Sequence, residues 1–216
     1  IKQHVLRAHA MDKIEMLARI LQAQGRGPTM VFCRTKRTCQ KTAEDLMERG
    51  FKAAPIHGDL GQSAREKALG DFKAGKSDVL VATDVAARGI DIDGITHVIN
   101  YQCPEDEKTY VHRIGRTARA GAHGIAVTFV DWDELARWKM INQVLDLGLA
   151  EPEETYSSSP HLYEVLDIPA GSTGRLTKSR PVVQQKAVTE KRVEKRAEPK
   201  PKIERNRTRT KKFKES

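Results

Sequence analysis

The sequence predicts an α/β protein: a parallel sheet with helices on both faces. Short apolar runs alternate along the chain with longer segments whose apolar residues recur at helical spacing. The short runs are continuously apolar, as expected of strands that are buried on both faces of a parallel sheet. Residues 1–147, which hold this alternation, are enough for one domain of that kind.

The elements follow one another in a regular order. Helical spacing predicts a first helix over residues 12–24, with Asp12 as N-cap and Gly25 as stop. The apolar run Thr29–Cys33 predicts a buried strand, and the amphipathic segment Lys36–Glu48 predicts a helix after it. The same signals continue with strands at 52–56, 78–82, 97–100 and 125–130, and helices at 62–72, 107–113 and 133–147.

Charge and composition separate a tail from the body of the chain. Residues 171–216 hold 16 Lys and Arg against 5 Asp and Glu, whereas residues 1–170 hold 22 against 24. The tail has one aromatic residue, Phe213, and cannot bury enough surface to offset the entropy of ordering, so we expect disorder. A cationic arm suits nucleic acid or an acidic membrane surface, and a solubilising tail is the alternative. Residues 148–170 contain both Pro and apolar residues, and predict a connector able to dock on the domain.

The cysteines and the hydropathy exclude several classes. Cys33, Cys39 and Cys103 are odd in number and form no Cys-x-x-Cys pair, so no disulfide framework and no metal site is predicted. A reducing cytoplasm fits this usage. No segment approaches the roughly 20 apolar residues of a membrane span, and no signal peptide is present. Because the first residue is Ile1 rather than Met, we expect a piece of a longer protein.

One string imitates a nucleotide-binding loop. Residues 70–77 read GDFKAGKS, which has the spacing of a phosphate loop. A true phosphate loop follows a strand and opens a helix, so that backbone N–H groups and the helix dipole converge on the phosphates. Here a predicted helix precedes the string and a predicted strand follows it, so we interpret it as an ordinary helix-to-strand turn.

Four other strings fall where ligands gather in parallel sheets, at the carboxyl ends of the strands. They are VFCRTKR at 31–37, HGDLGQSAR at 57–65, DVLVATDVAARGID at 78–91 and YVHRIGRTARAG at 110–121. Each alone has an ordinary explanation, such as solvated surface charge or a turn-forming residue. Their order, spacing and common edge favour a single site.

The fourth string carries two guanidiniums. If a helix runs through it, Arg116 and Arg119 are three residues apart and share a face, with His112 one turn before Arg116. A guanidinium is a planar fork that keeps its charge, which suits a polyphosphate. The string therefore favours phosphate chemistry over a basic, solvated helix face.

Together the four strings resemble motif IV, the QxxR element, motif V and motif VI of the DEAD-box ATP-dependent RNA helicases, in that order. The resemblance covers about residues 1–147 and is to the C-terminal RecA-like domain of the family. His112 stands where related families usually carry Gln, which favours the DEAD-box family over DEAH, RecQ and UvrB-like helicases. Ala118 departs from the pattern, since many members carry Gly there.

The resemblance implies roles for individual residues. Arg116 and Arg119 match the arginine fingers that reach the γ-phosphate of ATP, and Asp91 matches the carboxylate that binds its ribose. The implied ATP-binding residues are Gly89, Asp91, His112 and Arg113. The implied contacts to the RNA backbone are at Arg34, Thr35, Lys36, Gly58, Gln62, Arg65, Thr83, Asp84 and Arg88.

The resemblance also implies cofactors and partners. ATP and Mg²⁺ would be held mainly by an N-terminal RecA-like domain, because this chain has no credible phosphate loop and no Asp-Glu-Ala-Asp string. The other implied partners are RNA, bound through its backbone regardless of sequence, and ribonucleoprotein components, with no membrane. We expect an ATP-dependent RNA helicase whose C-terminal half alone hydrolyses ATP poorly or not at all. A non-catalytic RNA-binding scaffold of the same fold and a DNA-directed helicase of the same superfamily are the alternatives.

Overall fold

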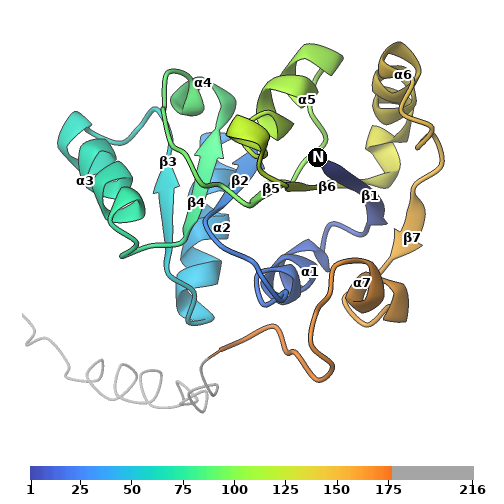
Figure 1. Cartoon of the computed structure of the whole chain (residues 1–216), viewed down its shortest axis with the longest axis horizontal. Coiled ribbons are helices and arrows are strands. Elements are labelled where there is room, and N and C mark those ends of the chain that lie inside the picture. The colour runs from blue at the N-terminus through green and yellow to red at the C-terminus, as the bar shows by residue number, and fades with distance from the viewer. Residues whose placement is uncertain (177–216) are drawn as a thin grey trace, which may run out of the picture. The chain divides into compact units, whose positions relative to one another are not determined.

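A parallel sheet lies at the centre of residues 1–176, the part of the chain that the computed structural model describes (Figure 1). Its strands are β1 (Lys2–Ala8), β2 (Thr29–Cys33), β3 (Ala53–Ile56), β4 (Val79–Thr83), β5 (His97–Asn100), β6 (Ile125–Val130) and β7 (Glu153–Thr155). Within these residues the sheet has seven strands in the order β3-β4-β2-β5-β6-β1-β7, and every neighbouring pair is parallel. The predicted α/β class is therefore confirmed.

The helices alternate with these strands along the chain. They are α1 (Lys13–Ile20), α2 (Lys36–Glu48), α3 (Gln62–Lys73), α4 (Asp84–Ala87), α5 (Glu107–Ile114), α6 (Leu135–Leu145) and α7 (Pro160–Val165), with short 3₁₀ turns η1 (Arg119–Gly121) and η2 (Trp132–Glu134). Every helix and strand predicted from the sequence is confirmed, with small differences at the ends. The pattern missed β1, β7, α4 and α7.

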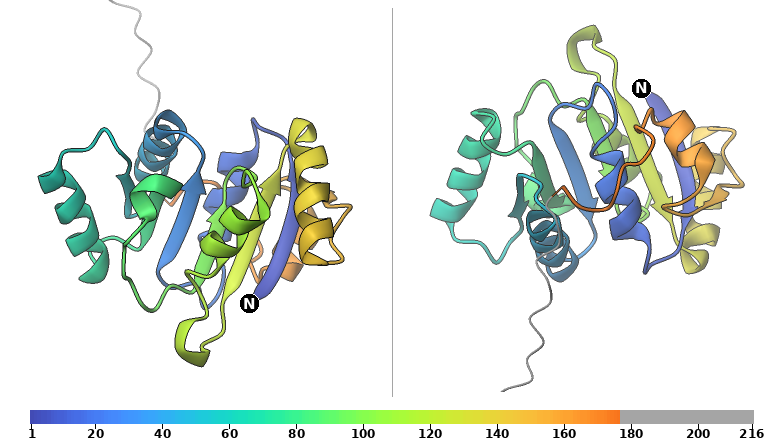
Figure 2. Two further views of the ribbon diagram at one scale, coloured as in Figure 1. Left: turned by 90° about the horizontal axis from the view of Figure 1, so that it is seen from above. Right: turned by 90° about the horizontal axis from the view of Figure 1, so that it is seen from below.

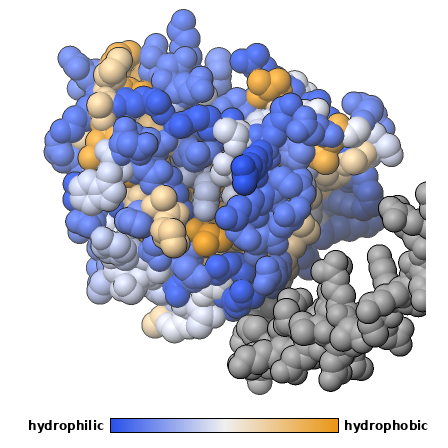
Figure 3. All heavy atoms as spheres, turned by 180° about the vertical axis from the view of Figure 1, so that it is seen from behind, coloured by the Kyte–Doolittle hydropathy of each residue, from blue (hydrophilic) through white to orange (hydrophobic). Residues whose placement is uncertain are grey.

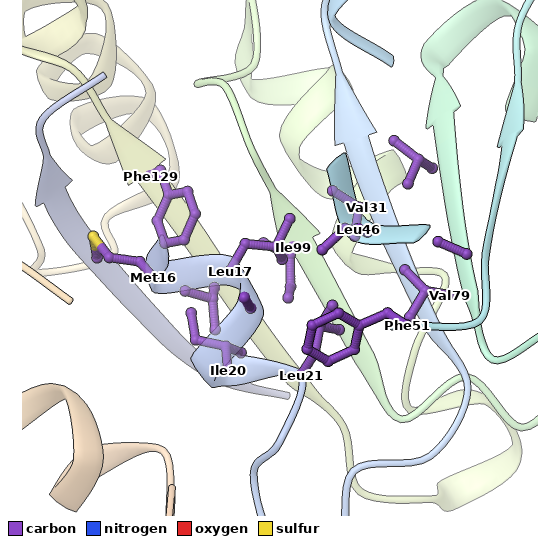
Figure 4. Packing of buried hydrophobic residues seen from close by; sticks show 14 of the residues in the cluster. Met16, Leu17, Ile20, Leu21, Val31, Leu46, Phe51, Val79, Ile99 and Phe129 are labelled. Carbon is purple, nitrogen blue, oxygen red and sulfur yellow. The ribbon is translucent and has the colours of Figure 1, made fainter. Parts of the chain in front are cut away.

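The two faces of the sheet bury different helices, as the two views of Figure 2 show. One face packs against α1, α2 and α7, and the other against α3, α4, α5 and α6. Strand residues alternate between the faces: in β2, Val31 belongs to the first core, while Met30 and Phe32 belong to the second. Figure 4 shows Met16 and Leu17 of α1 lying next to Phe129 and Ile99 of the sheet.

The string that imitates a phosphate loop is a turn, as interpreted from the sequence. Gly70 lies inside α3, which ends at Lys73, and β4 begins only at Val79. Gly75 between them has a φ of 72°, in the left-handed region that glycine adopts without strain. The backbone N–H of Lys76 donates to the carbonyl of Asp71 at 2.8 Å, which closes the turn.

Asp12 occupies the N-cap position of α1, as predicted, but its side chain does not cap the helix. Its carboxylate makes no cap bond to α1 and accepts instead from the backbone N–H and the hydroxyl of Ser157, at 2.6 and 2.7 Å. Ser157 belongs to the predicted connector, 148–170. A short-range sequence rule cannot anticipate a partner that lies 145 residues away.

The connector docks on the first face of the sheet. Leu162 is fully buried, and Leu166 and Ile168 are 3% and 5% exposed in the same core as α1. The chain then follows the end of α2, where Arg49 donates to the carbonyl of Gly174 at 2.7 Å. The rest of the predicted basic tail, residues 177–216, lies outside the described residues.

One face of the domain can be seen to be mainly hydrophilic (Figure 3). The face opposite to the view of Figure 1 carries only scattered hydrophobic patches (Figure 3). Within the same residues, no helix is long and apolar enough to cross a membrane.

Candidate functional site

The sheet brings the four strings together at its carboxyl edge. Cys33 at the end of β2 pairs with Thr83 at the end of β4, and Phe32 pairs with Asn100 at the end of β5. The end of β3 adjoins β4, where Ile56 pairs with Ala82. The loops that follow these strands are therefore neighbours, and α5 begins and ends beside them.

An ion pair joins the third string to the fourth. Arg113, in the last turn of α5, is 1% exposed and donates from Nε and a terminal nitrogen to both carboxylate oxygens of Asp84, at 2.7 and 2.6 Å. Its other terminal nitrogen donates to the carbonyl of Gln102 at 3.0 Å. Because Arg113 is buried, removing Asp84, whose side chain is 32% exposed, would leave an uncompensated guanidinium and cost up to about 3–5 kcal/mol. The pair therefore fixes α5 against the start of α4.

The two candidate fingers do not share a helix face. Helix α5 ends at Ile114, close to the predicted end at 113, so Arg116 lies in the loop that follows and Arg119 begins η1. The condition for a shared helix face, a helix running through both arginines, is not met. The loop turns at Ala118, whose φ of 57° is left-handed. Glycine adopts this conformation without the clash of a Cβ, so the backbone at Ala118 is more strained than it would be with glycine.

The loop is anchored at Thr117. This residue is 3% exposed, and its hydroxyl donates to the carbonyl of Ile95 at 2.6 Å. Gly124, on the return toward β6, lies so close that an added Cβ would come within 2.3 Å of the Thr117 hydroxyl oxygen. Only glycine fits there without displacing the loop that carries both arginines.

Arg116 and Arg119 are held by different partners. A terminal nitrogen of Arg116 donates to the carbonyl of Ile90 at 2.7 Å. Burial, and next the charge of Arg119, lower the pKa of Arg116, although arginine stays protonated at neutral pH. Arg119 lies 3.1 Å from a carboxylate oxygen of Asp91 and 4.0 Å from one of Asp93. Both carboxylates are more than 85% exposed, so solvent screens these pairs and a ligand can replace them.

An open cleft of about 330 Å³ lies between α4 and α5. Its lining residues are Phe32, Asp84, Ala87, Arg88, Gly89, Thr109, His112, Arg113 and Arg116. His112 and Arg88 are exposed, so their side chains are accessible from solvent. The cleft thus unites residues that the sequence assigned separately to ATP and to RNA.

A second group of predicted residues gathers at the start of α2. The Thr35 hydroxyl caps this helix by accepting from the N–H of Thr38 at 3.1 Å. Lys36 donates to Asp59 at 2.7 Å, with both side chains more than half exposed. A Cβ on Gly58 would lie 3.4 Å from the Lys36 side chain, so Thr35, Lys36 and Gly58 form one surface.

Of the other predicted RNA contacts, Arg34, Gln62 and Arg65 have partners within the protein and Thr83 is buried. The guanidinium of Arg34 bonds the buried carboxylate of Glu134 and the carbonyl of Cys103. Arg65 donates to the carbonyl of Ala86 at 3.0 Å, and Gln62 donates to Glu66 at 2.8 Å. The Thr83 side chain is 7% exposed. Contacts of these four residues with RNA stay predictions.

Sequence reasoning missed two residues that organise this edge. Glu134 is 5% exposed and accepts from Arg34 as well as from the backbone N–H of Asp131 at 3.0 Å. The Asp-x-x-Glu spacing of 131–134 is that of a capping box and was a usable signal. Gln102, whose side chain accepts from the Arg34 N–H at 2.8 Å, gives no comparable signal.

The three thiols of the chain are buried, and neither they nor the acidic groups of the described residues form a metal-binding cluster. Within residues 1–176, no group of three or more His, Cys, Asp or Glu side chains is placed to hold a metal ion. Cys33, Cys39 and Cys103 are buried and unpaired with one another, and burial raises the pKa of each thiol to about 12. Such thiols are poor nucleophiles at neutral pH.

The family follows from a comparison with known proteins. Residues 12–121 match the helicase conserved C-terminal domain, so the chain belongs to that family. The solved structures that it resembles include C-terminal domains of DEAD-box proteins. The chain is therefore a C-terminal helicase domain of the DEAD-box RNA helicases, and the resemblance stated from the motifs is confirmed.

Three similar proteins define the relationship more closely. The ATP-dependent RNA helicase CshA of Limosilactobacillus reuteri is 49% identical over 155 residues, which are 70% of this chain and 31% of that protein. The C-terminal domain of the DEAD-box protein Dbp5 superposes with a TM-score of 0.67 at 31% identity, covering 77% of this chain and 97% of that one. Escherichia coli SrmB gives 0.66 at 29% identity, covering 83% and 97%. The chain spans about a third of the length of the curated relatives that it matches.

Proposed function

We propose that the intact protein is an ATP-dependent RNA helicase in which this domain supplies Arg116 and Arg119 as arginine fingers. One observation carries the proposal. Two guanidiniums project from a single anchored loop beside Asp91, and the partners of Arg119 are exposed carboxylates that a phosphate can displace. The similar proteins named ATP-dependent RNA helicases support the same reading.

The residues present fit part of an ATP site. The exposed carboxylate of Asp91 suits ribose hydroxyls, and the two arginines suit the terminal phosphate. ATP supplies the phosphoryl group, and the guanidiniums stabilise the negative charge that develops during its transfer. Because residues 1–176 hold no candidate metal cluster, Mg²⁺ and most phosphate contacts are assigned in this proposal to an N-terminal RecA-like domain.

RNA is proposed to bind the same edge through its backbone. Thr35, Lys36 and Gly58 offer a hydroxyl, an exposed ammonium and an uncrowded backbone, which suit phosphates and sugars and carry no base specificity. ATP and single-stranded RNA together would close the two domains, and hydrolysis would reopen them. Bending of the bound strand during closure would separate it from its duplex partner.

Protein partners and location are further parts of the proposal. Structures similar to this chain include SrmB bound to regulator of ribonuclease activity A and Dbp5 bound to Gle1. We extend the expectation of protein partners to this domain on that basis. A cytoplasmic location stays a prediction from the cysteine usage.

Substitution of the fingers in the intact protein tests the proposal. We expect Arg116→Ala or Arg119→Ala to lower the RNA-stimulated ATPase rate by about 10³–10⁵-fold, because an arginine finger stabilises mainly the transition state. ATP affinity should change little by comparison. A suitable control is Arg7→Ala, which removes a guanidinium that pairs with Glu154. Arg7 lies on β1, which three strands separate from β4. ATPase rates and nucleotide binding should be measured for all variants.

The nucleic acid that stimulates hydrolysis separates this proposal from its alternatives. RNA and DNA single strands of equal length and sequence should be compared as activators of the intact wild-type protein. Stimulation by RNA alone is expected. Equal stimulation by DNA would favour a DNA-directed helicase, and no stimulation by either would favour a non-catalytic scaffold.

A further inference from the structure

We infer that Gln102 is a positioning residue that couples the RNA-binding surface to the ATP side of the domain. This inference rests on the proposed function. Gln102 lies two residues beyond the end of β5, in the loop that leads to α5. It belongs to none of the four strings that predicted the site.

Gln102 accepts two hydrogen bonds, one at its side chain and one at its backbone carbonyl. Its side-chain Oε1 accepts from the backbone N–H of Arg34 at 2.8 Å. Its own carbonyl accepts from Arg113 at 3.0 Å. One residue therefore contacts both the loop that opens α2 and the helix that leads to the candidate fingers.

On the RNA side, the bond to Arg34 fixes where α2 begins. Tyr101 N–H donates to the Phe32 carbonyl at 2.9 Å, which extends the β2–β5 pairing one step past the strand ends. Arg34 directly follows β2, and its backbone N–H donates to Oε1 of Gln102. Thr35 and Lys36 follow directly, so this bond sets the position of the residues that meet the RNA backbone.

On the ATP side, the carbonyl of Gln102 contacts a rigid group. Arg113 is almost fully buried and is held by both oxygens of Asp84. It stands three residues before Arg116, whose backbone N–H donates to the Arg113 carbonyl at 3.1 Å. A shift of the Arg34 backbone can thus reach the finger loop through the Gln102 side chain and the Arg113 guanidinium that the Gln102 carbonyl binds.

Replacing the Gln102 side chain in the intact protein tests this role. Gln102→Met keeps the length and removes the amide acceptor, whereas Gln102→Glu keeps an acceptor oxygen; the backbone carbonyl is unchanged in both. Gln143→Met, at an exposed glutamine on α6, is the matched control. The readout is the ratio of affinities for a labelled single-stranded RNA with and without a saturating non-hydrolysable ATP analogue.

We expect Gln102→Met to lower this ratio about threefold to tenfold, the effect of losing one neutral hydrogen bond. Gln102→Glu and Gln143→Met should stay within about twofold of the wild-type ratio. If Gln102→Met does not fold, Gln102→Asn carries the test, because its amide is one methylene too short to reach the Arg34 N–H.

A merely structural role gives a different result. The inference would be overturned if a folded Gln102→Met or Gln102→Asn variant kept the wild-type ratio of RNA affinities. This includes the case in which the variant loses RNA affinity equally with and without the nucleotide. Equal losses in Gln102→Met and Gln102→Glu would also overturn the inference. If the wild-type protein itself shows no effect of the analogue on RNA affinity, the proposed function fails rather than this inference.

Discussion

At the scale of single residues, Arg116 and Arg119 differ in how firmly the protein holds them. Arg116 is partly buried against the Ile90 carbonyl, while Arg119 faces two exposed carboxylates. The first guanidinium is therefore held more firmly than the second. In the proposed ATP site, Arg119 would leave Asp91 and Asp93 to reach a phosphate, and this movement would free the Asp91 carboxylate for the ribose.

Another residue-scale consequence concerns pH. Burial, and then the charge of Arg26, lower the pKa of His97 from 6.5 to about 4. As the pH falls below 6.5, His97 binds a proton in the unfolded chain before it does so in the folded domain. The free energy of unfolding therefore decreases progressively between pH 6.5 and pH 4. From pH 7.5 to 5, His97 should contribute a loss of about 1–2 kcal/mol to the free energy of unfolding.

The variant His97→Asn should flatten that part of the pH dependence. Its amide keeps a polar atom near the Thr96 hydroxyl, which lies 2.8 Å from Nδ1 of His97. Urea denaturation at several pH values gives the measurement, with His123→Asn, at an exposed histidine, as the control. The pKa of His4 is also lowered, by burial and Lys2, so some pH dependence should persist. If the free energy of unfolding depends on pH equally in the wild type and in His97→Asn, His97 is not the source of this pH dependence.

At the scale of elements, the central strands of the sheet were predictable from the sequence, whereas the edge strand β7 was not. Strands β2 and β4 are buried at every position, so a continuous apolar run marks them. Strand β7 reads Glu-Glu-Thr with two exposed residues, and its pairing with β1 depends on a chain segment far away in the sequence. Short polar edge strands carry no local signal of this kind.

The site was predictable to a similar degree. The motifs predicted the sheet edge at which the candidate residues lie, because parallel strands end together, and the roles of these residues stay predictions. The actual supports of the finger loop could not be predicted, since Thr117 bonds Ile95 and Arg113 bonds Asp84 across 22 and 29 residues. The helix expected to align Arg116 and Arg119 ends before either residue.

The connector supplies an element-scale prediction. Leu162→Ala, at a fully buried position in α7, should destabilise this domain by about 2–5 kcal/mol through lost contacts and a cavity. Val165→Ala on the same helix, at a residue 38% exposed, should cost less than about 1 kcal/mol. Chemical denaturation compares the two. Equal stabilities of the two variants would show that α7 does not belong to the core.

At the scale of the whole molecule, the basic tail is proposed to tether RNA without sequence preference. Because Gly174 and Leu176 bond Arg49, truncation after Leu176 removes residues 177–216 of the tail and keeps these contacts. If about six basic residues meet single-stranded phosphates, RNA affinity should fall by two to three orders of magnitude from about 50 to 200 mM salt. Truncation should flatten this dependence, and an unchanged slope would favour a solubilising tail.

The central claim is that this domain completes an ATP site with arginines. Its most direct test is the single-turnover rate of ATP hydrolysis by the intact protein, with ATP and RNA both saturating, for wild type and Arg119→Ala. The predicted result is a fall of at least about 10³-fold, with the affinity for ATP nearly retained. A rate within about tenfold of the wild type would contradict the claim.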